Sequence, residues 1–159
     1  MLEPTPVVLI VDDEPNTIKL IRLAMAKAGF HNKICEAHDG EEAIQYLQGA
    51  GSFENREQYP LPQLILLDLK MPRMGGLEFL KWYRNWPPGK CTPIVVLTTS
   101  GLSSDLMEAY AAGANSYVVK GGDAHALVEQ MNSIGSIWLT GLAKLPPVTE
   151  SFRVSAPPA

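Results

Sequence analysis

The stretch from Leu64 to Gly76 places the strongest constraint on what this chain can fold into. Its first four residues are branched and apolar, which is typical of a strand buried on both faces, and the Pro and paired Gly that follow force a turn. Asp68 therefore stands where the strand ends. Open parallel sheets bind their ligands at the carboxyl ends of strands, so Asp68 is a candidate nucleophile or metal ligand. An Asp that only caps the next turn fits this stretch equally well.

Length and charge narrow the class of protein. With 159 residues, of which 46% are apolar, the chain suits one globular domain with a sizeable core and leaves no room for a separate effector domain. The net charge is −4, and the 13 Lys and Arg residues are scattered rather than gathered on one stripe. We therefore expect no direct binding of nucleic acid.

The two cysteines and the lack of long apolar runs indicate the compartment. Cys35 and Cys91 have neither CxxC spacing nor histidine clusters nearby, so they predict neither a disulfide framework nor a zinc site. No apolar run approaches the roughly twenty residues that span a bilayer, and no export signal opens the chain. We expect a cytoplasmic protein that does not bind membranes.

Apolar runs and helical patterns alternate along the chain. This order predicts an α/β fold of the doubly wound type, in which a parallel sheet carries helices on both faces. The stretch 49–63 has no such pattern and is interpreted as a solvated insertion, and residues 146–159 predict a disordered tail. The expected strands are 7–11, 33–37, 64–67, 93–97 and 117–120, and the expected helices are 15–28, 40–48, 77–86, 105–112 and 123–142.

Four of the predicted strands end in chemically active side chains: Asp12 with Asp13, Asp68, Thr98 and Lys120. If those strands are neighbours, the side chains meet in one crevice at the carboxyl edge of the sheet. Three carboxylates that close together raise one another's pKa unless a cation intervenes. Because all the ligands are hard oxygens, the pattern favours Mg²⁺, which would prepare Asp68 for phosphoryl transfer.

These residues resemble those of the receiver domain of two-component response regulators, such as the chemotaxis regulator CheY. The resemblance covers residues 7–142, within a domain expected to span 1–145, and implies a five-stranded (βα)5 sheet in the order 2-1-3-4-5, as in flavodoxin and CheY. Asp68 and Thr98 are 30 residues apart, and Thr98 and Lys120 are 22 apart, as in the family. The motif is the ordered set Asp12-Asp13, Asp68, Met71-Pro72, Gly75-Gly76, Thr98 and Lys120.

The resemblance implies a role for each matched residue. Tyr117 matches an aromatic residue that swings inward when Thr98 is drawn to the phosphate, although a plain packing role also fits it. The remaining roles are Asp68 as phosphoacceptor; Asp12, Asp13, Asp68 and the backbone carbonyl of Lys70 as Mg²⁺ ligands; Thr98 and Lys120 as contacts of the phosphoryl group; and Thr98 with Tyr117 as the switch. Such a protein catalyses only its own phosphotransfer and dephosphorylation and is otherwise no enzyme.

A narrower resemblance concerns partners. The long stretch before the central strand, Gly121 after Lys120, and the endings 137–139 and 145–147 are similar to the phytochrome-associated single-domain regulators. The resemblance implies a light-sensing histidine kinase as phosphodonor, and a homodimer formed through the last strand and helices.

Three residues near the predicted site differ from the usual pattern of the family. Gly121 stands where the family commonly has a cis Pro, so the direction of the Lys120 side chain is less constrained. Lys70 and Thr99 beside the site predict a changed phosphoryl lifetime.

Three rival families lack a residue or motif that they need. A haloacid-dehalogenase phosphatase needs an acid where Lys70 stands, a flavin carrier needs a hydroxyl-rich phosphate loop, and a dinucleotide site needs GxGxxG. The serious alternative is a degenerate receiver that acts as an interaction module without phosphorylation.

Overall fold

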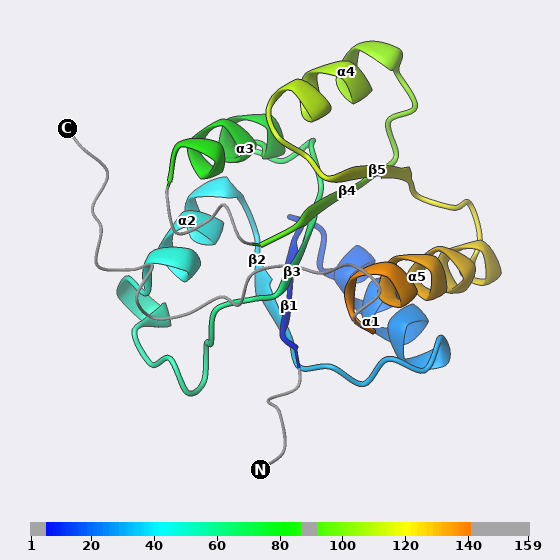
Figure 1. Ribbon diagram of the computed structural model, residues 1–159, viewed down its shortest axis with the longest axis horizontal. Coiled ribbons are helices and arrows are strands. Elements are labelled where there is room, and N and C mark those ends of the chain that lie inside the picture. Colours follow the sequence, from blue (N-terminus) through cyan, green and yellow to red (C-terminus); the bar gives the residue numbers. More distant parts are fainter. Residues whose placement is uncertain (1–5, 87–91, 141–159) are drawn as a thin grey trace.

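The computed structural model describes residues 6–86 and 92–140. Across these residues, five strands alternate with five α-helices, and one short 3-10 helix, η1, follows the second helix (Figure 1). The elements are β1 (Val8–Val11), α1 (Pro15–Lys27), β2 (Ile34–Ala37), α2 (Gly40–Gln48), η1 (Gly51–Phe53), β3 (Leu64–Leu67), α3 (Gly76–Asn85), β4 (Ile94–Thr98), α4 (Ser103–Ala111), β5 (Ser116–Val119) and α5 (Ala124–Trp138).

The strands form one parallel sheet in the order β2-β1-β3-β4-β5, which confirms the predicted order. In the register of the sheet, Val11 of β1 lies beside Leu67 of β3, and Thr98 of β4 lies beside Val119 of β5. The residues that directly follow these strands therefore come out at the same edge. The prediction that these apolar runs are strands ending at one shared edge of the sheet is confirmed.

The sheet separates two apolar layers because successive side chains of a strand point to opposite faces. Leu9 and Val11 face α2, α3 and α4, whereas Val8 and Ile10 face α1 and α5. Figure 1 shows α1 and α5 together on one side of the sheet and α2 and α3 on the other. Every residue of β1, β3 and β4 is buried, which explains why these strands read as unbroken apolar runs.

The helices begin where the sequence places caps and turns. Pro15 occupies the start of α1, and the Asp39 carboxylate accepts a hydrogen bond of 2.8 Å from the backbone N–H of Glu42 at the start of α2. At the start of α3, a Cβ atom on Gly76 would lie 2.3 Å from the carbonyl oxygen of Asp68. Only glycine fits there, so α3 packs directly onto the backbone of the candidate acceptor.

The stretch 49–63 corrects one expectation, because it is not simply a solvated insertion. The ring of Phe53 in η1 is buried, with its centroid 5.2 Å from that of Tyr46 and 5.1 Å from that of Tyr59. Arg56 donates hydrogen bonds to the backbone carbonyls of Tyr46, Leu47 and Tyr59 at 2.6, 2.7 and 2.9 Å. Two aromatic rings and one guanidinium thus fold the segment back onto the carbonyl end of α2.

Most element boundaries differ from the expected ones by one or two residues, as at α4, which begins at Ser103 rather than at residue 105. The last helix is the exception: α5 ends at Trp138, four residues before the expected end at residue 142. Among the described residues, none of the helices combines the length and apolar character that a membrane crossing requires. Four predicted features lie outside the described residues: the helix stop at 87–89, Cys91, the 145–147 motif and the tail from residue 146.

Candidate functional site

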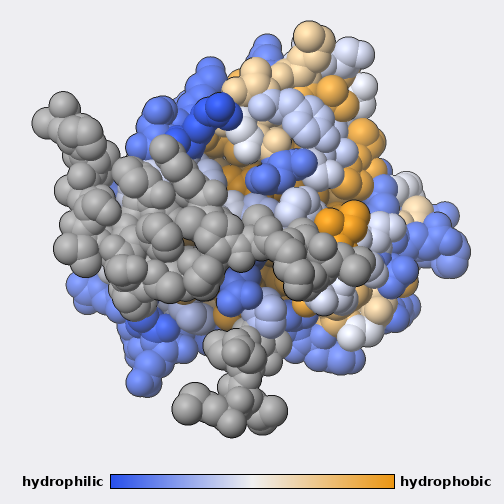
Figure 2. All heavy atoms as spheres, in the orientation of Figure 1, coloured by the Kyte–Doolittle hydropathy of each residue, from blue (hydrophilic) through white to orange (hydrophobic). Residues whose placement is uncertain are grey.

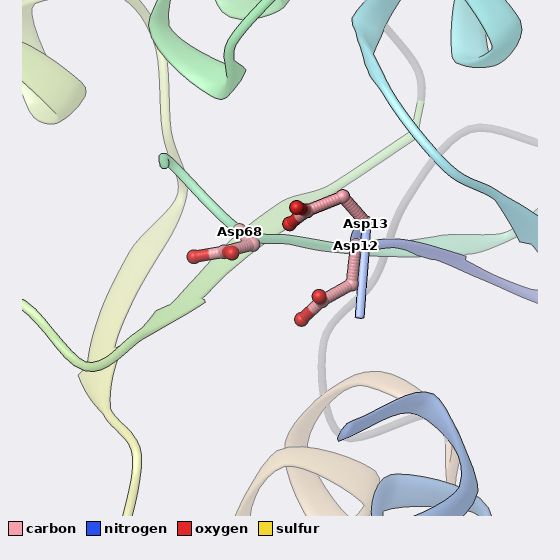
Figure 3. Close-up of side chains that lie close together, drawn as sticks. All are labelled: Asp12, Asp13 and Asp68. Atoms are coloured by element: carbon pink, nitrogen blue, oxygen red, sulfur yellow. The ribbon is translucent and has the colours of Figure 1, made fainter. Parts of the chain in front are cut away.

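Three carboxylates meet at the carboxyl edge of the sheet. Asp12 and Asp13 follow β1, Asp68 follows β3, and one carboxylate oxygen from each lies within 4.8 Å of the others. Figure 3 shows the three side chains projecting to the same side from the ends of these neighbouring strands. Asp12 is 2% exposed and Asp68 is 9% exposed. We call this cluster of Asp12, Asp13 and Asp68 the acidic notch.

Lys120 brings a positive charge to the acidic notch. Its ammonium nitrogen lies 3.0 Å from Oδ2 of Asp12, although it follows β5 and Asp12 follows β1. The other oxygen of Asp12, Oδ1, accepts a hydrogen bond of 2.9 Å from the backbone N–H of Glu14. The side chain of Lys120 is 13% exposed, so this ion pair is largely shielded from water. One ammonium against three carboxylates leaves the site negative.

The electrostatics of Asp68 reflect this imbalance. Burial raises the pKa of Asp68, the Lys120 ammonium lowers it, and the nearby charge of Asp12 raises it again. The Thr98 hydroxyl and the backbone N–H of Lys70 also lower it by hydrogen bonding, but the net shift is upward. The ionised carboxylate is therefore incompletely compensated by the protein alone.

The donor set fits a hard divalent cation. Within the described residues, the acidic notch is the one cluster of acidic, His or Cys side chains with metal-ligand spacing, and all of its donors are carboxylate oxygens. Mg²⁺ and Mn²⁺ favour such ligands, and zinc favours nitrogen and sulfur. A cation bound there would also favour the ionised form of Asp68 and so counteract its raised pKa.

Thr98 contacts Asp68, and Tyr117 contacts the loop that follows Thr98. Thr98 is fully buried at the end of β4, and its hydroxyl hydrogen-bonds the Asp68 carboxylate. Tyr117 is half-buried, packs against the core, and donates a hydrogen bond of 2.8 Å to the backbone carbonyl of Ser100. The position of Tyr117 fits both a packing role and a link to the loop after Thr98.

Lys70 is placed differently from the other predicted residues. Its backbone N–H hydrogen-bonds Asp68, whereas its side-chain Nζ lies 3.4 Å from Oδ1 of Asp105 in α4. Asp105 also accepts a short hydrogen bond from the Ser100 hydroxyl. Sequence reasoning missed Asp105, although an acid in the first turn of a helix after a hydroxyl run was the available signal.

Gln130 is a second residue that sequence reasoning missed. Its side chain extends from α5 to the backbone on both sides of Lys120. No pattern in the sequence marks it, because a lone glutamine on a helix is usually a solvated residue.

Comparisons with known proteins agree with this geometry. The family model for the response regulator receiver domain matches residues 8–132. The response regulator Rcp1 of Synechocystis is 33% identical over 136 residues, which cover 86% of this chain and 90% of Rcp1.

Solved structures extend the comparison. The phosphorylated cyanobacterial phytochrome response regulator RcpA superposes with a TM-score of 0.81 at 32% identity, covering 90% of this chain and 99% of RcpA. The Mn²⁺-bound form of Rcp1 superposes with a TM-score of 0.78 at 32% identity, covering 89% of this chain and 99% of that one. With its fold, its acidic notch and these matches, the chain belongs to the family of response regulator receiver domains.

Proposed function

We propose that this protein is a phosphoacceptor in two-component signalling, in which Asp68 takes a phosphoryl group from a sensor histidine kinase in an Mg²⁺-dependent reaction. The observation that carries the proposal is the acidic notch, whose three carboxylates lie within 4.8 Å of one another beside the Lys120 ammonium. The receiver domain would span residues 1–145, and the protein would act in the cytoplasm.

The metal ligands would be the carboxylates of Asp12, Asp13 and Asp68 with the backbone carbonyl of Lys70. A bound Mg²⁺ would neutralise negative charge on the carboxylates and on the incoming phosphoryl group. The protein's own part is to hold the Asp68 carboxylate in a fixed orientation. The contact of Gly76 with the Asp68 backbone and the hydrogen bonds from Thr98 and Lys70 support that orientation.

In the proposed transfer, a carboxylate oxygen of Asp68 attacks the phosphorus atom of a phosphohistidine. The new O–P bond forms as the P–N bond breaks, and its electron pair stays on the imidazole nitrogen. The product is an acyl phosphate on Asp68. Lys120, which now contacts Asp12, would turn its ammonium to a phosphoryl oxygen, and the Thr98 hydroxyl would move from the carboxylate to another oxygen.

Hydrolysis by water would then end the signal. Lys70 and Thr99 lie close in the chain to Asp68 and Thr98, and they would change the lifetime of the acyl phosphate by altering the approach of that water. The Thr98 shift would pull on Ser100 and, through it, on the Tyr117 hydroxyl.

The output would be a changed surface on α4, β5 and α5, which includes a homodimer contact. Apolar side chains are exposed there: Met107 is 68% exposed, and Tyr110 and Val119 are each 44% exposed. Figure 2 shows hydrophobic atoms gathered over the upper right of the molecule, where α4 and β5 lie. Exposed apolar patches of this kind are typical of contact surfaces.

The phosphodonor would be a phytochrome-like histidine kinase. This part of the proposal is supported by the solved relatives, because RcpA is described as a phytochrome response regulator and a second regulator, RPA3017 of R. palustris, acts in red light signalling. RPA3017 superposes with a TM-score of 0.84 at 30% identity and covers 89% of this chain and 99% of its own.

The test is phosphorylation by acetyl phosphate with Mg²⁺, followed by intact-protein mass spectrometry. We expect the mass of one phosphoryl group on the wild type, none on Asp68→Asn, and none after chelation of Mg²⁺. Asp39→Asn removes a buried carboxylate outside the acidic notch and should leave the mass addition intact. An unmodified wild type would instead support the interaction module that does not depend on phosphorylation.

A further inference from the structure

The residues around Lys120 do little by themselves to restrict its backbone conformation. It follows the edge strand β5, whose four residues are at most half-buried, and it precedes two glycines, Gly121 and Gly122. Glycine loses more conformational freedom on folding than any other residue. Within the described residues, no peptide bond is cis, so no cis proline stiffens this loop.

Gln130 supplies the missing constraint. Its Nε2 donates a hydrogen bond of 2.6 Å to the carbonyl oxygen of Val119, and its Oε1 accepts one of 2.9 Å from the N–H of Gly121. One side-chain amide therefore binds the residue before Lys120 and the residue after it.

This pair of bonds has the pattern of a parallel ladder. In such a ladder, one residue bonds the C=O before and the N–H after the residue opposite it. The amide of Gln130 thus takes the position of a sixth strand at the free edge of β5. On the other side, the N–H of Lys120 donates a hydrogen bond of 2.7 Å to the carbonyl of Thr98 in β4.

The helix that carries Gln130 is itself well fixed. Asp123 caps α5 through a hydrogen bond of 2.8 Å from the N–H of Ala126, and α5 packs on α1. A Cβ on Gly121 would lie 2.5 Å from the Cβ of Ala126, so the loop sits tightly against the first turn of α5. The clamp therefore connects Lys120 to a rigid element.

We infer that Gln130 is a positioning residue for phosphoryl transfer: it holds the backbone on both sides of Lys120 so that the ammonium reaches the acidic notch. This inference rests on the proposed role of Lys120 at the phosphoryl group. Gln130 itself does not contact the reacting atoms.

Gln130→Met tests the inference, because it keeps the length of the side chain and removes both hydrogen bonds. We expect the rate of phosphorylation by acetyl phosphate at saturating Mg²⁺ to fall about fivefold to tenfold, as expected for the loss of two modest hydrogen bonds. The Mg²⁺ concentration at half-maximal rate should not change, because no metal ligand is altered. Gln130→Glu keeps the acceptor for Gly121 and should restore part of the rate. Gln45→Met makes the same substitution on α2 and is the matched control. It should be phosphorylated at the wild-type rate.

A Lys120→Ala background distinguishes positioning from a general loss of structure. We expect Gln130→Met to have no further effect on the phosphorylation rate there. A Gln130→Met protein that reacts at the wild-type rate, or that loses the same factor with and without Lys120, would overturn the inference.

A second measurement does not depend on phosphorylation. The coupling between Lys120 and Asp12 is obtained from urea unfolding of Lys120→Met, Asp12→Asn and the double variant. It should decrease when residue 130 is Met, and an unchanged coupling would refute the inference. If the wild type takes up no phosphoryl group, the proposed function fails, and this cycle alone decides the role of Gln130.

Discussion

Two flanks of the sheet differ in how they are packed. The α2 flank, residues 40–59, buries Tyr46 and Phe53 and fixes its loop with Arg56. The α4 flank, residues 101–119, buries only Ala109 among the nine residues of α4, and β5 contributes no fully buried residue among its four. The α2 flank therefore contributes large aromatic side chains to the core, whereas the α4 flank contributes three alanines, Ala109, Ala112 and Ala114.

The loop between β3 and α3 touches both flanks and shows the same difference. Arg73 makes an ion pair and a hydrogen bond with the Asp39 carboxylate, which is 3% exposed. On the other flank, Lys70 lies 3.4 Å from Asp105, whose carboxylate is 15% exposed. The two cations are about equally exposed, at 64% for Arg73 and 65% for Lys70, so the contact of Lys70 is the weaker one because of its longer distance and its more exposed carboxylate. A change of charge at Asp68, five residues before Arg73, should therefore displace the α4 flank more easily than the α2 flank. We therefore expect the α4 flank, which has the weaker contact, to be the surface that moves.

The largest expected contrast concerns apolar side chains. Phe53→Ala should lower the free energy of unfolding by about 3 kcal/mol, because it leaves a cavity beside two aromatic rings. Met107→Ala, on the exposed surface of α4, should change it by less than about 0.5 kcal/mol. Urea unfolding monitored by circular dichroism measures both. Similar losses in the two variants would contradict the difference between the flanks.

A matched pair of hydroxyls sharpens the comparison. The hydroxyl of Tyr46 donates to the carbonyl of Pro60 at 2.6 Å, and that of Tyr117 donates to the carbonyl of Ser100 at 2.8 Å. Tyr46→Phe should cost about 1.5 kcal/mol of stability because a shielded carbonyl loses its donor, and Tyr117→Phe about 0.5 kcal/mol because water replaces it. If Tyr117→Phe proves the costlier change, the α4 flank is more tightly held than its packing indicates.

The acidic notch lies between the flanks and should affect how stability depends on pH. Because burial and Asp12 raise the pKa of Asp68 above its usual range, ionised Asp68 destabilises the metal-free fold once the pH exceeds the ordinary carboxyl pKa. Asp68→Asn should therefore raise the free energy of unfolding by about 1 kcal/mol at pH 7, the order of one incompletely compensated charge. The gain should shrink as the pH falls through about 4 and disappear below about pH 3, where the carboxyl is protonated in both states.

Mg²⁺ provides the control for that prediction. The wild type should gain thermal stability on addition of Mg²⁺ and Asp68→Asn should gain less, because it has lost one ligand. An equal gain in the two proteins would remove Asp68 from the proposed metal site.

The smallest effects come from the two ion pairs. Burial raises the pKa of Asp39, but the Glu42 N–H and the Arg73 guanidinium lower it more, so the net pKa lies below its usual value. This stability is present above the unfolded pKa and is lost as the pH falls through the folded one. Arg73→Ala should therefore destabilise the protein at pH 6 and progressively less below about pH 4. Lys70→Ala should have a smaller effect at pH 6, and a larger one would reverse the assignment of firm and loose contacts.

Features of the fold and site that one local rule fixes were predictable from the sequence. Unbroken apolar runs end in Asp12, Asp68 and Thr98, and parallel strands bring those ends to one edge, so the fold class and the shared edge were predictable. The strand order, which makes these strands neighbours, came from the resemblance to receiver domains. The packing of Phe53 was not predictable, because a polar stretch with isolated aromatics has no periodicity to read. The contacts of Gln130 and Asp105 were not predictable either, because each joins elements whose separation depends on how whole helices pack.

The side-chain amide of Gln130 has a consequence for how copies of the protein meet. Free edges of a sheet invite another strand to add to them. Here the β5 edge is occupied beside Lys120, and at the opposite edge the guanidinium of Arg22 donates to the carbonyl of Ile34 at 3.2 Å. A strand that added to either edge would have to displace one of these side chains. We therefore expect self-association to use side-chain contacts on the α4, β5 and α5 surface, and continuous sheets between molecules, with the fibrous aggregates they seed, to be disfavoured.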